Sequence, residues 1–269
     1  MQEVYDGELI IQQVLKHREQ QPWIGTRKLM WLMKDFALEH RIDIGRDALF
    51  DLLREHHLLI RSRKRKMQTT FSRHRFKKYK NQIRDFVPLA PNLLWVSDIT
   101  YITVADEFGY LSLITDAYSR KIVGYHLSKT LEASGSIKAL QMALDSCGDV
   151  SSLMHHSDRG IQYCCNDYVK MLTDKNIKIS MTENGDPLEN AIAERVNGIL
   201  KCELLQEKYN CFEDAKTSVE NAGVIYNSLR PHSSCDMLTP IEAHKKQGAL
   251  KKHWKNYYKK KEVIMERQE

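Results

Sequence analysis

The stretch LLWVSDITYITVADEFGYLSLITDAYSRKIVGYHL, residues 93–127, decides the expected fold. Its β-branched and aromatic residues, which strands favour, fall into three short runs at 93–104, 110–115 and 121–127. Polar residues at 106–109 and 116–119 are typical of turns between strands. The stretch therefore predicts three consecutive strands.

The residues that follow alternate between helical and strand patterns. Apolar spacing predicts helices at 133–146, 166–175 and 189–207, and short strands at 153–156 and 177–181. Three strands followed by this alternation predict an α/β fold, with a mixed sheet flanked by helices. This is the element order of a ribonuclease-H-like core, which we expect at residues 91–250.

Residues 1–60 have a different, all-helical pattern. Apolar residues recur at helical spacing, and Gly25 and Gly45 each stand just before a helical segment. Short helices joined by such turns are typical of a helix-turn-helix, which places one helix in a DNA groove. The same spacing fits a helical dimerisation or packing domain about equally well. We expect a helix-turn-helix-like DNA-binding module and keep that alternative.

The strongest charge run in the sequence follows this helical part. Residues 61–80 hold ten Lys and Arg and no acid, interleaved with Phe71, Phe76 and Tyr79. Such a stretch suits phosphate contacts and base stacking, whereas a solvated linker is the ordinary alternative. We expect a basic linker at 61–90 and a second basic stretch in the C-terminal tail at 251–269. The residues predicted to contact DNA are Arg61, Arg63, Lys64, Arg65, Lys66, Arg73, Arg75, Lys77 and Lys78.

The composition excludes some classes of protein. The chain of 269 residues has a formal net charge of +6, which suggests a polyanionic partner but is also common among soluble proteins. Its six cysteines include no Cys-x-x-Cys pair, which argues against a zinc site or a disulfide framework. The sequence has no 18-residue apolar run and no secretory leader pattern. We therefore expect a cytoplasmic protein without a membrane segment and without zinc.

Three acidic residues on separate elements form the candidate catalytic site. Asp98 lies in the middle of a predicted strand, where aspartate is rare unless it is exposed, paired or bound to a metal. Asp158 follows the strand at 153–156, and Glu194 lies on the polar face of the last long helix. Singly, they have ordinary explanations as an exposed, a turn and a solvated residue. Together they would suit two Mg²⁺ ions, as two-metal cleavage of a phosphodiester requires. The same helical face carries Asn190, Asn197 and Lys201.

Motifs around these residues resemble those of a known family. The 35 residues 159–193 separate Asp158 from Glu194, and Lys201 comes seven residues after Glu194. This spacing is similar to the D,D(35)E signature of retroviral integrases and many bacterial transposases. Over nearly its whole length the chain resembles the second-frame (OrfB) transposases of the insertion sequence 3 family. The motifs are WVSDITY at 95–101, HSDRGIQY at 156–163, ENAIAER at 189–195 and YNSLRPH at 226–232, followed by Thr239 and Pro240.

The resemblance implies an integrase-type core in which Asp98, Asp158 and Glu194 are catalytic and bind two Mg²⁺ ions, for which Mn²⁺ can substitute. It implies a DNA transposase that cuts the 3′ ends of its element and then uses each freed 3′-OH to attack another phosphodiester. Lys201 is then expected to contact a phosphate of the DNA. The expected partners are double-stranded DNA of the element ends and the target, further copies of the chain on DNA, and a first-frame (OrfA) product or a fusion with it.

Two other functions fit parts of the pattern. A DNA-binding regulator would occupy the element ends without cutting, although clustered carboxylates argue against a pure binder. A ribonuclease or junction resolvase would use the same core on a different substrate. Near the triad, His155 and His156 are expected to have packing or hydrogen-bonding roles rather than a role in proton transfer. Asp116 is interpreted as a turn residue and not as a fourth catalytic carboxylate.

Overall fold

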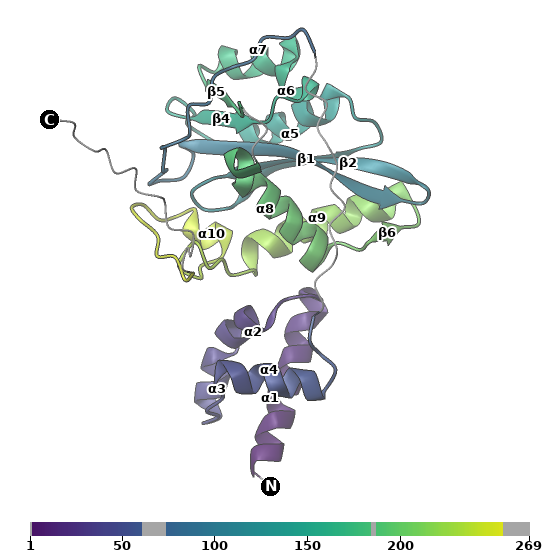
Figure 1. The fold of residues 1–269 in the computed structure, drawn as a ribbon, viewed down its shortest axis with the longest axis vertical. Helices are drawn as coiled ribbons and strands as arrows, with labels where there is room; N and C mark the ends of the chain where they lie inside the picture. Colours follow the sequence, from purple (N-terminus) through teal and green to yellow (C-terminus); the bar gives the residue numbers. More distant parts are fainter. Residues whose placement is uncertain (1, 61–73, 184–186, 255–269) are drawn as a thin grey trace, which may run out of the picture.

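The computed structural model describes residues 2–60, 74–183 and 187–254. An α/β core built on a six-stranded sheet lies next to a separate group of N-terminal helices (Figure 1). Several residues predicted to contact DNA lie outside the described residues, as does the tail from 255 onwards. These are Arg61, Arg63, Lys64, Arg65, Lys66 and Arg73.

The sheet begins with the three predicted strands. β1 (Leu94–Val104), β2 (Glu107–Asp116) and β3 (Ile122–Ser128) pair antiparallel. β4 (Met154–Ser157) and β5 (Lys178–Met181) continue the sheet in parallel on the other side of β1. The order is therefore β3-β2-β1-β4-β5, and the short β6 (Lys208–Tyr209) pairs with the far end of β1. The predicted mixed sheet is confirmed, with β1 as its central strand.

Helices cover both faces of the sheet (Figure 1). One face carries α5 (Ala133–Asp145), α6 (Ile161–Cys164) and α7 (Asn166–Asp174), and the other carries α8 (Ala191–Ile199) and α9 (Phe212–Ser228). The short α10 (Pro240–Ala243) follows α9.

The side chains of β1 alternate between the two helical layers, as strand geometry requires. Trp95 packs into the apolar cluster that contains residues of α5 and α7, whereas Val96 packs with Ala193 of α8. Further along the strand, Ile102 joins the cluster formed with α8 and α9. Asp98 has the same parity as Val96 and Ile102, and therefore lies on the face that α8 covers.

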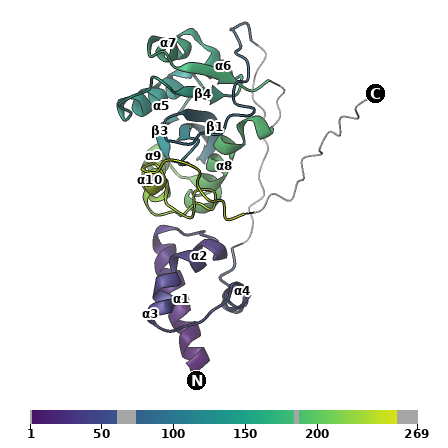
Figure 2. The same cartoon turned by 90° about the vertical axis from the view of Figure 1, so that its left-hand side faces the viewer.

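The N-terminal helices form a small module with its own apolar cluster (Figure 2). They are α1 (Gln2–Gln20), α2 (Thr26–Leu32), α3 (Lys34–Glu39) and α4 (Arg46–Glu55). Gly25 and Gly45 immediately precede α2 and α4, so both predicted helix starts are confirmed. No helix within the described ranges is long and apolar enough to cross a membrane.

A charged contact joins this module to the core. Glu203 accepts hydrogen bonds from Nε and Nη2 of the buried Arg230, each at 2.8 Å. Lys28 of α2 places its Nζ 3.2 Å from Glu203 Oε1. Burial, and then the charge of Arg230, lower the pKa of Lys28 to about 8, although Glu203 opposes the change.

Two predicted elements have different bounds in the structure. The helix expected at 189–207 consists of a 3₁₀ turn (Pro187–Asn190), α8 and a π-helical turn (Leu200–Leu204). The wider π turn is followed by Leu205, whose side chain is buried in the cluster beneath the sheet. The turn expected at 106–109 lies instead at Ala105 and Asp106, because Gly109 is a strand residue paired with Ile102. A glycine in a strand was misread as a turn signal.

Candidate active site

Two buried asparagines hold Asp98 and its strand against α8. Asn197 donates a hydrogen bond from Nδ2 to Asp98 Oδ2 at 2.7 Å. Asn190 donates from Nδ2 to the carbonyl oxygen of Ser97 at 2.9 Å. The two amides therefore bond to consecutive residues of β1 and fix the strand relative to the helix that carries Glu194.

Asp158 comes directly after β4, the parallel neighbour of β1. The pairing of Trp95 with His155 and of Val96 with His156 aligns the two strands, so that Asp98 and Asp158 each lie two residues beyond the last paired position. Asp158 Oδ1 accepts a hydrogen bond from the backbone N–H of Gly160 at 2.9 Å. Asp158 therefore stabilises the turn after β4, as expected for a turn residue, and it also directly follows the strand neighbouring that of Asp98.

The three carboxylates interact electrostatically. Burial raises the pKa of Asp98 to about 7, and the negative charge of Asp158 is the next largest cause. Glu194 raises this pKa as well, whereas the hydrogen bonds from Asn197 and from the Ile99 backbone lower it. Throughout the described part of the chain, however, no three His, Cys, Asp or Glu side chains are grouped closely enough to hold a metal ion. Asp158 and Glu194 thus both affect the pKa of Asp98, but the three carboxylates do not form a closed set of metal ligands.

The chemistry of this site fits a hard divalent cation. The acidic donors Asp98, Asp158 and Glu194 offer only oxygen, which Mg²⁺ and Mn²⁺ prefer. The raised pKa of Asp98 means that its surroundings do not compensate its negative charge, which a bound cation would do. The Oδ1 atom of Asn197, whose Nδ2 bonds to Asp98, is buried without a hydrogen-bond partner among the described residues. Such an acceptor suits a water molecule of a hydrated ion.

The two histidines next to Asp158 have hydrogen-bonding roles, as expected. His155 Nε2 lies 2.7 Å from Ser97 Oγ and 2.9 Å from the Tyr168 hydroxyl. Burial lowers the pKa of His155 to about 3. His156 bonds to Ser180 Oγ and to the Glu189 carbonyl oxygen, and burial lowers its pKa to about 4. Both imidazoles are therefore neutral at pH 7.

Lys201 lies close to the strand that carries Asp98. It is part of the π-helical turn, and its Nζ is 3.4 Å from Thr100 Oγ1. Burial lowers the pKa of Lys201, and the charge of Asp98 is among the opposing causes. Lys201 therefore lies near β1, close enough to Asp98 for the charge of that carboxylate to affect its pKa.

The aromatic residues of the basic linker differ from expectation. Arg75, Lys77 and Lys78 are exposed, but Phe76 and Tyr79 pack against the apolar cluster that contains residues of α5 and α7. The two rings expected to stack on bases are therefore partly covered by the core. The run of cations with aromatic residues between them was visible in the sequence, whereas the apolar surface that receives the rings is formed only by tertiary folding.

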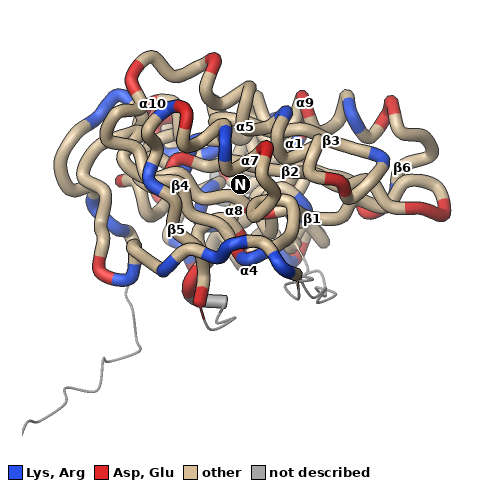
Figure 3. Tube along the Cα trace, turned by 90° about the horizontal axis from the view of Figure 1, so that it is seen from above, with Lys and Arg blue, Asp and Glu red and all other residues tan. Residues whose placement is uncertain are grey.

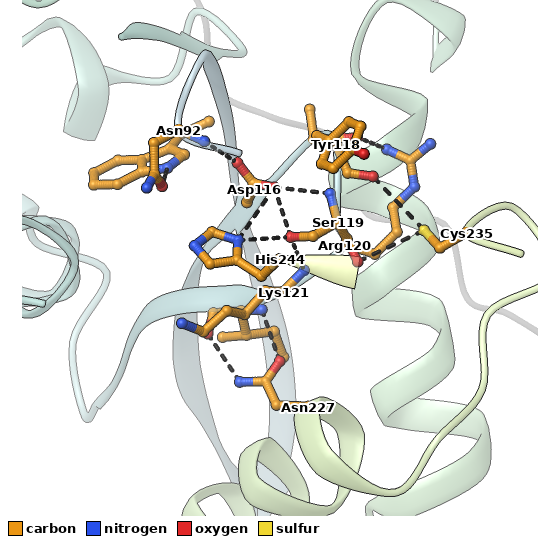
Figure 4. A network of polar contacts seen from close by, with 12 residues as sticks. Asn92, Asp116, Tyr118, Ser119, Arg120, Lys121, Asn227, Cys235 and His244 are labelled. Atoms are coloured by element: carbon orange, nitrogen blue, oxygen red, sulfur yellow. Dashed lines mark hydrogen bonds and ion pairs between the residues drawn. The ribbon is translucent and has the colours of Figure 1, made fainter. Parts of the chain in front are cut away.

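Asp116 belongs to a separate buried network, drawn in Figure 4. Its Oδ1 accepts hydrogen bonds from the N–H and hydroxyl of Ser119 at 2.8 and 2.6 Å, and its Oδ2 accepts one from the Asn92 N–H at 2.8 Å. Ser119 Oγ also lies 3.0 Å from Nδ1 of His244, which follows α10. Asp116 therefore stabilises a turn and ties the C-terminal segment to the sheet, in agreement with its exclusion from the triad.

Sequence reasoning missed the role of Asn190 and Asn197. Both were assigned to a polar helix face that points away from the packing face, yet both side chains are buried against β1. Their spacing of seven residues, with Glu194 between them, was the available signal.

Comparison with known proteins identifies relatives of this chain. Two models described as integrase core domain match residues 88–187 and 175–240. A Shigella sonnei protein, the uncharacterized 31 kDa protein of insertion element IS600, is 33% identical over 90% of this chain and 88% of its own length. The Escherichia coli transposase InsF of insertion sequence IS3A is 34% identical over 62% of this chain and 58% of its own length.

The fold is also similar to a solved structure of a retroviral assembly. A chain of the simian T-cell lymphotropic virus intasome, determined in complex with a PP2A regulatory subunit, superposes with a TM-score of 0.51. The similarity covers 90% of this chain and 74% of that chain at 18% identity. At this level of identity the likeness concerns the fold.

Proposed function

Because the chain belongs to the insertion sequence 3 family of transposases and contains the integrase core domain, we propose that Asp98, Asp158 and Glu194 catalyse its DNA cleavage and joining. The family assigns the protein to DNA transposition. In the proposed reaction, water first cuts the 3′ ends of the element. The freed 3′-OH then attacks another phosphodiester.

The observation that carries this proposal is the raised pKa of Asp98. A partly buried carboxylate whose pKa is raised by burial, and further by two acids next to an adjacent strand and on a covering helix, is typical of an active site. A protein that only bound DNA would gain nothing from this arrangement. The carboxylate field instead costs stability until a cation compensates it.

Asp98, Asp158 and Glu194 are the residues that would hold two Mg²⁺ ions, and Mn²⁺ is expected to substitute. When bound, the ions activate the attacking oxygen and stabilise the leaving oxygen. Asn197 orients Asp98 through its 2.7 Å hydrogen bond, so that one carboxylate oxygen has a fixed direction. Lys201 would bind a phosphate of the DNA, a role supported by its proximity to Thr100 and by the effect of Asp98 on its pKa. His155 and His156 are neutral and support the strand, and no proton transfer is assigned to them.

The test is metal-dependent nicking of a duplex that contains an element end. We expect the unaltered protein, or its fusion to the first-frame product, to nick the end in Mg²⁺ or Mn²⁺. Glu194→Gln should lower the rate by at least about a thousandfold, in the range that loss of an essential catalytic group produces. Glu220→Gln, which neutralises an exposed acid on α9, is the matched control and should retain activity.

Nicking that persists in Glu194→Gln would exclude the assigned triad. Salt-sensitive binding of the ends without any metal-dependent product would favour the regulator instead. Preferential cutting of an RNA hybrid or a four-way junction would favour a ribonuclease or a resolvase.

The proposed partners are the element ends, the target DNA, further copies of this chain and the first-frame product. Light scattering of the protein with and without an end-containing duplex tests the assembly. A complex that contains two or more chains on DNA would support it, whereas one chain for each duplex under cleaving conditions would contradict it.

A further inference from the structure

Residues 74–84, here called the basic strip, are fixed along the edge of the core next to β5. At the start of the strip, His74 Nε2 donates a hydrogen bond to the carbonyl oxygen of Arg159 at 2.8 Å. Near its end, Gln82 donates from its backbone N–H to Ser180 Oγ at 2.9 Å and from Nε2 to the Ile179 carbonyl oxygen at 3.0 Å. The strip is thus bonded to the core near both of its ends.

Two apolar residues orient the cations of the strip. Phe76 and Tyr79 pack against the cluster that contains residues of α6, α7 and β5. Four basic side chains between and beside these anchors are exposed, and Figure 3 shows basic positions gathered along this edge of the molecule. They are Arg75, Lys77, Lys78 and Lys80. Because both rings contact the core, they anchor the backbone between them, and the four cations lie on its exposed side.

The strip starts close to a proposed catalytic residue. His74, at the start of the strip, bonds to the carbonyl oxygen of Arg159, which is the residue directly after Asp158. Lys78 is near α6, the helix that follows this turn, because Lys78 and Arg159 both act to lower the pKa of the Cys164 thiol, which burial raises. A line of exposed cations therefore leads along the edge of the sheet to the turn that holds Asp158.

We propose that the basic strip is a preformed binding surface for the DNA backbone, which aligns the phosphates of one strand with Asp158. This inference rests on the proposed function, since it takes DNA as the substrate, and adds a specific, anchored surface to it. Each anchored cation that contacts a phosphate releases a counterion from the DNA. Because the strip is already anchored to the core, DNA binding avoids the entropic cost of ordering a flexible segment that carries these cations.

The first experiment measures binding of the full chain to an end-containing duplex in EDTA, over a series of salt concentrations. The absence of metal separates this test from catalysis, so it remains valid even if the protein does not cut DNA. We expect Lys77→Gln/Lys78→Gln to reduce the slope of log affinity against log salt concentration by about 2, since each phosphate contact contributes about 0.9. The matched control, Lys245→Gln/Lys246→Gln, neutralises an adjacent exposed pair after α10 and should leave the slope unchanged. A strip variant whose slope equals that of the control would overturn the proposal.

The second experiment tests the anchors at constant charge. Phe76→Ala/Tyr79→Ala keeps every cation but frees the strip, and should weaken binding by about tenfold, because the cations must then be ordered on binding. Phe76→Leu keeps an apolar anchor and should bind as tightly as the unaltered protein. Circular dichroism checks the fold of each variant, and the lysine pair decides the question if the double anchor variant unfolds. Unchanged affinity in a folded double anchor variant would show that the strip acts as a flexible linker.

Discussion

Replacing Asp98 with asparagine is expected to stabilise the metal-free protein at pH 8 while abolishing its DNA cleavage. The pKa of Asp98 is about 7 in the folded chain, compared with the usual 3.8. At about 1.36 kcal/mol for each pH unit, this difference corresponds to about 4 kcal/mol. Part of the Asp98 side chain reaches solvent, so we expect a gain of about 2–4 kcal/mol in the free energy of unfolding.

The gain depends on pH in a defined direction. Between about pH 4 and pH 7 the folded state of the unaltered protein binds a proton at Asp98 that the unfolded state has released. Its free energy of unfolding therefore falls as the pH rises through this range. Asparagine has no proton to lose. The advantage of Asp98→Asn is thus full above pH 7 and disappears towards pH 4.

The assay is urea denaturation in EDTA at pH 8 and pH 5, followed by circular dichroism. Asp106→Asn is the matched control, because this carboxylate at the hairpin tip is 99% exposed. Adding Mg²⁺ at pH 8 should stabilise the unaltered protein and have less effect on Asp98→Asn, since a ligand stabilises the state that binds it. An Asp98→Asn variant that is no more stable than the unaltered protein at pH 8, or that gains equally at pH 5, would refute the reasoning.

Four further substitutions test contacts at the site and elsewhere in the fold by the same denaturation assay. Asn197→Ala removes the amide donor from the partly buried carboxylate of Asp98 and should cost about 1.5–3 kcal/mol at pH 8, and less at pH 5; an equal cost at both pH values would contradict the charged nature of this bond. Arg230→Gln leaves Glu203 without its bidentate partner and should cost about 3–5 kcal/mol. Lys28→Gln leaves the Arg230–Glu203 pair intact and should cost less than about 1 kcal/mol. Similar costs for Arg230→Gln and Lys28→Gln would show that Arg230 is not the main partner of Glu203. Gly124→Ala places a Cβ against a backbone carbonyl oxygen of α5 and should cost about 1–3 kcal/mol, with no loss expected only if β3 can move away from the helix.

The sheet could be predicted from the sequence because local patterns determine it. The alternating β-branched residues of 93–104 form one long strand in the structure, and the helices after it lie close to their predicted bounds. The spacing between Asp158 and Glu194 pointed to the same site as the electrostatic coupling of both acids to Asp98. These features depend on residue type and separation along the chain, which a sequence displays directly.

Features that depend on contacts between distant segments could not be predicted in the same way. The polar stripe that contains Asn197 is compatible with solvent exposure, and only its packing on β1 gives the amide its carboxylate partner. Phe76 resembled a base-stacking ring until the apolar cluster that receives it was known. The π-helical turn at Leu200–Leu204, which is followed by the buried Leu205, likewise had no local signal in the sequence.

The order of the elements also matters while the protein is being synthesised. All strands from β1 to β5 precede residue 182, whereas α8, which covers one face of the sheet, starts at Ala191. Until that helix leaves the ribosome, the apolar side chains of Leu94 and Val96 lack their partner Ala193. A nascent chain that stops early therefore lacks both Glu194 and the cover of its sheet, which makes it a target for chaperones and proteases.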